Sequence, residues 1–178
     1  PTEVTSTIIN NENKTLEMDW QPIINDDQDT IEKMLVILRD VTNLRKLQKE
    51  TENQKRELMI IDEILTCSIL QFKIFINNSN KLIDECLALI EKNEKIDLDL
   101  INHLFRNIHT IKGNARLYQL NHLTDRIHEF EQILDHQRKA ENIDLTKEKL
   151  YEDFEIVIDN QLDYIKVFEG KLGHIDTD

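Results

Sequence analysis

Residues 97–120 read DLDLINHLFRNIHTIKGNARLYQL and carry the clearest helical pattern in the sequence. Its apolar residues recur every three or four positions and form one stripe of an amphipathic helix, namely Ile101, Leu104, Ile108, Ile111, Ala115 and Tyr118. With about 100° of rotation per residue, His109 lies about 130° from the centre of that stripe and Lys112 about 70°. The sequence therefore predicts a core-facing helix that carries a histidine on its rim.

Three further segments share this helical pattern. The four predicted helices cover residues 72–93, 97–120, 121–140 and 145–170. Asp97 and Thr146 are suitable N-cap residues, and Gly170 is a suitable helix stop. Amphipathic helices on short loops are typical of an antiparallel bundle. We therefore expect a mainly α fold, with a four-helix bundle at residues 72–170 and a tail at 171–178.

Residues 1–42 have a different pattern, in which apolar and polar residues alternate or cluster. Residues 34–38 form a short apolar run that predicts a buried strand, and the polar residues 25–29 predict a turn. We expect two or three strands that form a small β-hairpin. Because an isolated hairpin is marginally stable, it should pack on the helical part, on a second copy, or on something outside this chain.

Residues 15–42, and in particular the stretch from 20–23 through 38–42, resemble the last strands of a PAS sensor domain, whose final strand typically ends in an Asp-x-Thr signature before a helix. The likeness covers about 30 residues. The earlier elements that would form a PAS ligand pocket are not in this sequence. The resemblance therefore implies a remnant of that fold and no ligand.

A linker helix is predicted over residues 43–71. Its apolar stripe follows a heptad spacing with two polar members, through Leu44, Leu47, Thr51, Gln54, Leu58, Ile61 and Leu65. Such a seam is typical of a parallel coiled coil, which would make the protein a homodimer through residues 43–66. The alternative is that the same stripe packs on the C-terminal helices, and the sequence leaves both open.

Composition excludes several functions. Three Gly and two Pro in 178 residues leave no material for a Gly-rich nucleotide loop, so ATP binding within this chain is not expected. A net charge of -13 disfavours nucleic acid and anionic membranes as partners. No apolar run approaches the roughly 18 residues of a membrane helix. We expect a cytoplasmic location, although a longer parent polypeptide could be membrane-attached, and reduced core thiols at Cys67 and Cys86.

The segment around His109 lacks acidic residues. The chain has 35 Asp and Glu, so about five would be expected between Asp99 and Asp125, where there are none. The charged residues that remain there are basic, namely Arg106, Lys112 and Arg116. Gly113 costs a helix interior about 1 kcal/mol relative to Ala. We expect Arg106, Gly113 and Arg116 to form a surface for a phosphate-bearing partner.

The chemistry that fits His109 is phosphoryl acceptance. An accepting histidine presents one neutral ring nitrogen, while the other nitrogen donates its hydrogen to a carboxylate that fixes the tautomer. Glu131 is the candidate carboxylate. A loop near Asn121 would turn the chain back, with His109 12 residues before it and Glu131 10 residues after it. Antiparallel helices would therefore bring the two side chains together.

These residues lie in two segments that resemble motifs of a known family. Residues 100–113, LINHLFRNIHTIKG, resemble the core motif of the histidine phosphotransfer (HPt) domain family, and residues 128–131, HEFE, resemble its downstream His-x-x-Glu. Residues 161–164, QLDY, also look alike. The likeness covers residues 72–169 and is closest to the amino-terminal phosphotransfer domain of chemotaxis kinases of the CheA type. Asn114 and Gln119 depart from it, because the family often has glycine at both positions.

The resemblance implies a role for each site residue. His109 would carry the phosphoryl group, Glu131 would orient it, and Lys112 and His128 would join the hydrogen-bond network. A histidine kinase catalytic domain would load His109 from ATP. The aspartate of a response-regulator receiver domain, with its own magnesium, would unload it. The chain itself would be a phosphoryl carrier rather than an enzyme, with no metal or cofactor of its own.

Three rival interpretations are weaker. A metal-binding bundle would use His109, His128, Glu131 and His136, but di-metal bundles use paired Glu-x-x-His motifs, and this chain has one reversed pair with a lysine where a second ligand should be. A structural dimerisation linker would leave His109 idle. The phosphoacceptor domain of an ordinary sensor kinase usually has an acidic residue directly after the histidine, where this chain has Thr110.

Overall fold

The computed structural model describes residues 2–9, 12–24 and 31–174. The chain divides into two units, Pro1–Arg56 and Glu57–Asp178, and each is described by itself. The division falls inside one continuous helix, α1 (Thr42–Cys67). The turn predicted at residues 25–29 lies outside the described residues.

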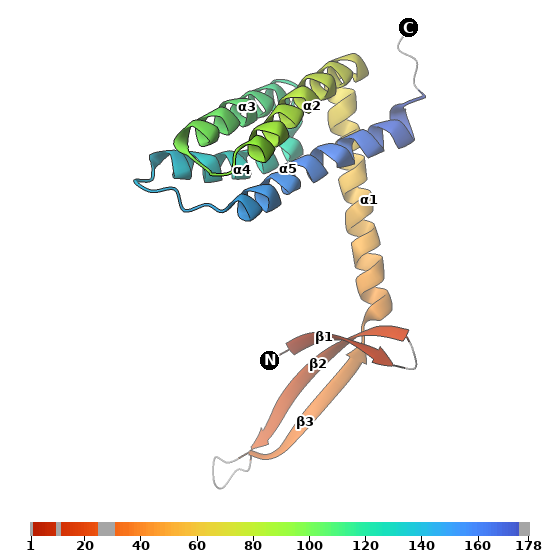
Figure 1. Ribbon diagram of the computed structural model, residues 1–178. Coiled ribbons are helices and arrows are strands. Elements are labelled where there is room, and N and C mark those ends of the chain that lie inside the picture. The colour runs from red at the N-terminus through yellow and green to blue at the C-terminus, as the bar shows by residue number, and fades with distance from the viewer. Residues whose placement is uncertain (1, 10–11, 25–30, 175–178) are drawn as a thin grey trace. The chain divides into compact units, whose positions relative to one another are not determined.

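The first unit contains a three-stranded antiparallel sheet. Its strands are β1 (Thr2–Ile9), β2 (Glu12–Ile24) and β3 (Ile31–Asp40), in the order β1-β2-β3 (Figure 1). The prediction that residues 34–38 form a buried strand is wrong, because Met34, Leu35, Val36 and Leu38 are about half exposed. A single-layer sheet leaves a strand's side chains uncovered unless another layer packs on them.

The exit from the sheet is held by the Asp-x-Thr residues. Asp40 Oδ1 accepts hydrogen bonds from the Thr42 amide at 3.0 Å and the Thr42 hydroxyl at 2.5 Å. Thr42 Oγ1 in turn accepts a hydrogen bond from the Thr15 amide of β2 at 2.9 Å. The hydrogen bond from the Thr42 hydroxyl, followed by that from its amide, lowers the pKa of Asp40. Asp40 and Thr42 thus fix the point where β3 ends and α1 begins.

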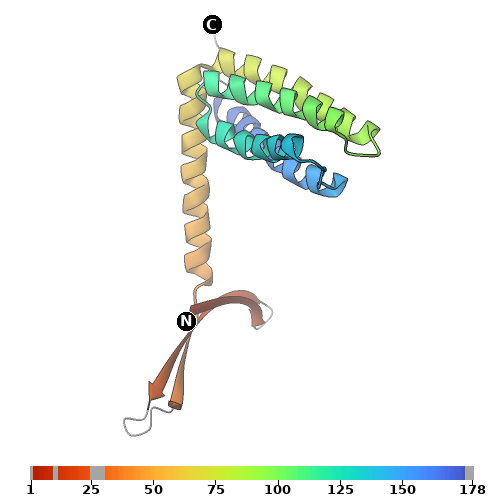
Figure 2. The same ribbon diagram turned by 90° about the vertical axis from the view of Figure 1, so that its left-hand side faces the viewer.

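The second unit is built around four helices, α2 (Ile69–Lys92), α3 (Leu98–Leu117), α4 (Asn121–Lys139) and α5 (Lys147–Val167). Helix α2 packs on α3 and α5, and α4 packs on the same two helices, which closes the bundle (Figure 1). Figure 2 shows α2 and α3 in one layer and α4 and α5 in the other. The predicted mainly α fold with a four-helix bundle is confirmed.

The helix ends follow the sequence signals at two of three places. Asp97 Oδ1 accepts the Leu100 amide at 2.8 Å, and Thr146 Oγ1 accepts the Lys149 amide at 3.2 Å, so both predicted N-caps are confirmed. The predicted helix stop at Gly170 is wrong. After α5 the chain continues as a π-helical segment, η1 (Phe168–Leu172). Leu172 is buried in the core, and this apolar contact extends the bundle beyond the glycine.

The C-terminal part of α1 packs on the bundle mainly through residues outside the heptad stripe, and Ile61 of the stripe packs there as well. Ile60, Ile64 and Cys67 are buried in the core. Leu58 and Leu65 of the stripe are 66% and 52% exposed. The alternative in which the stripe packs on the C-terminal helices therefore holds at Ile61 but not at Leu58 and Leu65. The exposed leucines of the stripe remain available to another helix.

The start of α4 depends on contacts from distant helices. Leu120, at the N-cap position, provides no side-chain cap. Instead, Glu63 of α1 accepts a hydrogen bond from the His122 amide at 3.2 Å, and the Tyr164 hydroxyl of α5 accepts one from the Leu123 amide at 3.3 Å. Tyr164 also donates its hydroxyl hydrogen to Glu63. These contacts satisfy amide groups that α4 cannot pair internally, so α1 and α5 fix where α4 begins.

The chain reverses between α3 and α4 through Gln119, whose φ is 60°. This left-handed conformation costs an ordinary residue roughly 1–2 kcal/mol and is relaxed for glycine. The Leu120 amide donates to the Ala115 carbonyl at 2.9 Å, which closes the end of α3. Helix α3 therefore ends at Leu117 rather than at the predicted residue 120.

The cysteines are unpaired core residues. Cys67 and Cys86 are both free thiols and both buried. Burial raises the pKa of Cys86 to about 12 and also raises that of Cys67, which keeps both as unreactive thiols. Among the helices that the structure describes, none is both long and apolar enough to cross a membrane.

Candidate functional site

His109 lies in the middle of α3, on the rim of the bundle. Its side chain is 63% exposed, and its Nδ1 is 2.6 Å from Oε1 of Glu131 on α4. A carboxylate oxygen can only accept, so Nδ1 carries the hydrogen in this contact. In the neutral ring, Nε2 then keeps its lone pair. The imidazole is thus held in the tautomer that presents Nε2 as a nucleophile.

Glu131 is the centre of the site. Its side chain is only 7% exposed, and its Oε2 accepts hydrogen bonds from Lys112 Nζ and from His128 Nδ1, the latter at 3.3 Å. Burial raises the pKa of this carboxyl group, but hydrogen bonds from Lys112, His109 and His128 outweigh it, so the net shift is downward. Glu131 therefore stays charged at neutral pH.

The antiparallel register of α3 and α4 assembles these four residues. His109 and Lys112 are one turn apart on α3, and His128 and Glu131 are one turn apart on α4. Gln132 supports the group, with its Nε2 3.2 Å from Nε2 of His128. If the amide donates to that nitrogen, the Nδ1 hydrogen of His128 points at Glu131. The structure therefore brings His109, Lys112, His128 and Glu131 together, as the sequence had predicted for the His109 and Glu131 pair.

The basic residues predicted to face a partner lie at the surface. Arg106 and Arg116 are exposed on α3, and Gly113 is exposed between them. A Cβ atom added at Gly113 would meet nothing within 4 Å. Packing within the described chain therefore does not require glycine here. The open backbone leaves room for another molecule close to His109.

Sequence reasoning gave no role to two residues beside His109. The Phe105 ring stacks on the imidazole, with 5.7 Å between ring centroids and 17° between planes. The guanidinium carbon of Arg138, on α4, lies 4.0 Å from the centroid of the Phe105 ring. Phe105 could have been found one turn before His109. Arg138 has no local signal, because only the register of α3 against α4 brings it there.

The residues of the metal interpretation are arranged as follows in the structure. Within the described residues, no group of three or more His, Cys, Asp and Glu side chains is arranged to hold a metal ion. The Lys112 ammonium occupies the second oxygen of Glu131, where a cation would have to bind. His136 lies farther along α4, past the cluster.

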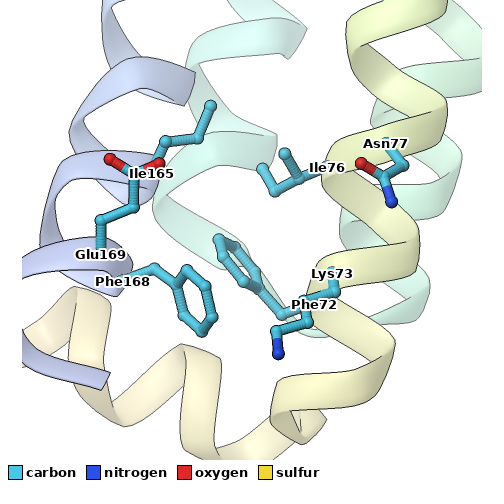
Figure 3. Close-up of a pocket in the computed structure, with 7 residues that line it drawn as sticks. All are labelled: Phe72, Lys73, Ile76, Asn77, Ile165, Phe168 and Glu169. Carbon is cyan, nitrogen blue, oxygen red and sulfur yellow. The ribbon is translucent and has the colours of Figure 1, made fainter. Parts of the chain in front are cut away.

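Another hollow lies away from this site, between α2 and the residues where α5 passes into η1. Its volume is about 300 Å³. Figure 3 shows the residues that line it, namely Phe72, Lys73, Ile76, Asn77, Ile165, Phe168 and Glu169. The rings of Phe72 and Phe168 lie 5.3 Å apart, and Lys73 Nζ lies 5.7 Å from the Phe168 ring centroid. It is an apolar pocket with charges at its edge and without a histidine, so it lacks the chemistry that α3 and α4 assemble.

Comparisons with known proteins agree with this geometry. Residues 72–166 match the sequence model of the Hpt domain family. The match covers more than half of the chain, and the chain belongs to that family. It therefore contains a histidine phosphotransfer domain.

One curated relative is the Sensor histidine kinase CheAY of Helicobacter pylori (strain ATCC 700392 / 26695), with 44% identity over 62 residues. The matched segment covers 35% of this chain and 8% of that kinase. The chain thus spans only a small part of this relative's length. No solved structure matches the chain.

Proposed function

We propose that this chain is a phosphoryl carrier of a two-component system. His109 accepts a phosphoryl group from a histidine kinase catalytic domain and passes it to an aspartate in a response-regulator receiver domain. The observation that carries the proposal is the exposed His109 whose Nδ1 hydrogen is held by the buried, charged Glu131. Membership of the Hpt domain family supports it. The name of the Helicobacter relative, a sensor histidine kinase, supports a kinase as the donor.

The chemistry balances at each step. The Nε2 lone pair of His109 attacks the γ-phosphorus of ATP held by the kinase, so a P–N bond forms, the P–O bond to ADP breaks and ADP leaves. The ring then carries positive charge with hydrogen still on Nδ1, and Glu131 lies 2.6 Å away to stabilise it. In the second step the receiver's aspartate oxygen attacks phosphorus, and the P–N electron pair returns to Nε2.

Positioning and charge are what this bundle contributes. Phosphoryl transfer depends mainly on holding the nucleophile in line and neutralising charge. His109 supplies the nucleophile, Glu131 fixes its tautomer, and Lys112 neutralises the buried carboxylate. The ATP site and the magnesium belong to the partners in this scheme, so the chain acts as a carrier and not as a kinase.

The proposal is tested with chemical loading followed by transfer. The purified chain is incubated with phosphoramidate, a small-molecule phosphoryl donor, and then mixed with the receiver domains encoded in the same genome, one at a time. We expect an acid-labile label on the chain that moves rapidly to at least one receiver domain. A chain that takes up no label, or a label that no receiver domain accepts, would contradict the proposal.

Gly113→Ala should raise the stability of the folded chain and slow phosphoryl transfer. Because the added methyl group meets nothing within 4 Å, the variant should be more stable, by up to about 1 kcal/mol. We expect slower phosphoryl transfer to the receiver domain, because the methyl group enters the surface that the partner approaches. Thermal unfolding and transfer rates measure the two effects.

Gly170→Ala is the matched control, because a Cβ atom there also meets nothing within 4 Å, and Gly170 lies in η1 rather than on α3. It should leave the transfer rate unchanged. Equal transfer rates for Gly113→Ala and the parent chain would show that no partner approaches this part of the helix.

We also propose that the heptad stripe of α1 forms a parallel coiled coil between two copies of the chain. Leu44, Leu47, Leu58 and Leu65 are all more than half exposed, although they are large and apolar. The face that buries Ile60 and Ile64 is already used by the bundle. A second α1 helix is the occupant that a heptad stripe fits best.

Light scattering on the full chain tests the dimer. The parent should be dimeric, and the double variant Leu47→Glu with Leu58→Glu should be monomeric, because four glutamates would meet in the seam. Leu117→Glu, at an exposed leucine on α3, is the control and should remain dimeric. A monomeric parent chain would rule out the coiled coil.

A further inference from the structure

A second recognition feature lies one turn from His109, towards the start of α3. It is a surface groove of about 400 Å³ between α3 and α4, lined by Asp99, Asn102, His103, Phe105, Arg106 and Arg138. Its wall therefore carries two arginines against one carboxylate, in a chain whose net charge is -13. The groove is locally suited to a negatively charged group.

Arg138 is held in a defined place in this groove. Its guanidinium carbon lies 4.0 Å from the centroid of the Phe105 ring, and Phe105 in turn stacks on His109 with 5.7 Å between centroids. These two distances keep the guanidinium within about 10 Å of the imidazole, which is about one Debye length at 0.1 M salt. One partner molecule can therefore contact Arg138 and His109 at the same time.

The contacts of Arg138 leave its hydrogen-bond donors largely unused. The guanidinium carbon lies over the Phe105 ring, and in such a cation–π contact the N–H groups at the edge of the guanidinium can still reach other acceptors. Within the described residues, Arg138 forms its ion pair with Asp135, whose Oδ1 is 4.0 Å from Nη1, beyond hydrogen-bond distance. Asp135 also forms an ion pair with Lys139. Arg138 can therefore offer a paired set of donors to a carboxylate without losing an internal hydrogen bond.

We propose that Arg138 is a specificity-determining residue, which binds a carboxylate side chain of the receiver domain in this groove and so places the receiver's aspartate against His109. The proposal rests on the proposed function of His109. A carboxylate matches the planar, two-pronged geometry of the guanidinium. Phe105 has two roles here, because it orients Arg138 on one side and contacts the imidazole on the other.

The test uses the full chain loaded with phosphoramidate and the receiver domain that accepts its label fastest. Transfer rates are measured against receiver concentration, which separates the half-saturating concentration from the maximal rate. For Arg138→Gln we expect the half-saturating concentration to rise about three- to ten-fold at low salt, with the maximal rate unchanged. The difference in half-saturating concentration between Arg138→Gln and the parent should shrink in 1 M salt. Arg138→Lys should have a half-saturating concentration between those of the parent and Arg138→Gln.

Lys139→Gln is the matched control. Lys139 is the next residue, is 73% exposed, pairs with the same Asp135 and carries the same charge, but does not line the groove. Lys139→Gln should change neither the half-saturating receiver concentration nor the maximal transfer rate. Equal effects of Arg138→Gln and Lys139→Gln would overturn the proposal in favour of general charge attraction. A lower maximal rate at an unchanged half-saturating concentration would also overturn it, because Arg138 would then act on the transfer step and not on docking.

Failure of this proposal is distinguishable from failure of the proposed function. If the parent chain takes up the label and passes it on while Arg138→Gln behaves like the parent, only the role of Arg138 is contradicted. If the parent chain takes up no label, the function of His109 itself is contradicted.

Discussion

His109→Gln should abolish phosphoryl uptake by the chain. Glutamine can occupy the same exposed position on α3, but its amide nitrogen has no lone pair available to attack phosphorus. The bundle should fold normally, because the His109 side chain is 63% exposed and lies outside the core. Labelling from phosphoramidate and from a histidine kinase with ATP measures the loss, and circular dichroism checks the fold.

His136→Gln is the control for this experiment. His136 is exposed on α4 and lies outside the cluster around Glu131. Labelling should be unchanged in this variant. If labelling survives His109→Gln and is lost in His136→Gln, the assignment of the acceptor is wrong.

Glu131→Ala should slow phosphoryl uptake strongly without removing the acceptor. The substitution takes away the group that holds the Nδ1 hydrogen and stabilises the charged ring. Losses of comparable orienting partners at metal-bound histidines run to about 10- to 100-fold, and we expect a decrease on that scale. The uptake rate of Glu131→Gln should lie between those of the parent and Glu131→Ala. The glutamine amide oxygen can still accept the Nδ1 hydrogen but carries no charge. Unchanged labelling rates in Glu131→Ala would contradict the orienting role.

The same residue predicts a pH dependence of stability. The folded chain holds the pKa of Glu131 below its ordinary value of 4.5. Its contribution to stability is therefore fully present above that ordinary value, and is lost as the pH falls through the lower pKa of the folded state. In thermal unfolding between neutral and acidic pH, Glu131→Ala should lose less stability than the parent on acidification. If stability depends on pH in the same way in both proteins, the Glu131 carboxylate does not contribute to the pH dependence of stability.

The sequence predicted those parts of the molecule that depend on short-range patterns. The 3.6-residue stripe around Ile108 placed the helix and its buried face, and the residue types at Asp97 and Thr146 placed two helix starts. The proximity of His109 to Glu131 followed from counting residues on both sides of one loop. Helix geometry and one assumption about where the chain reverses are enough to predict each of these features.

Features that depend on packing between distant segments were not predictable in this way. The start of α4 is fixed by Glu63 and Tyr164, which lie on other helices and carry no local signal. Leu172 continues the bundle past Gly170 because an apolar contact outweighs the usual helix-stopping role of glycine. Arg138 joins the site only through the side-by-side register of α3 and α4.

The exposed β3 side chains are a second case in which the local sequence pattern did not predict burial correctly. An apolar run such as residues 34–38 predicts burial, but it contains no information about which layer does the burying. Within the described residues of the first unit the run lies in a three-stranded sheet, where Leu38 and its neighbours remain about half exposed.

The most direct test of the account is to locate the phosphoryl group on the loaded chain. Nitrogen-resolved NMR of the imidazole side chains distinguishes the two ring nitrogens after loading with phosphoramidate. We expect a single phosphohistidine, at His109, with phosphorus on Nε2 and hydrogen retained on Nδ1 towards Glu131. Phosphorus on Nδ1 of His109, or on any other side chain, would contradict it.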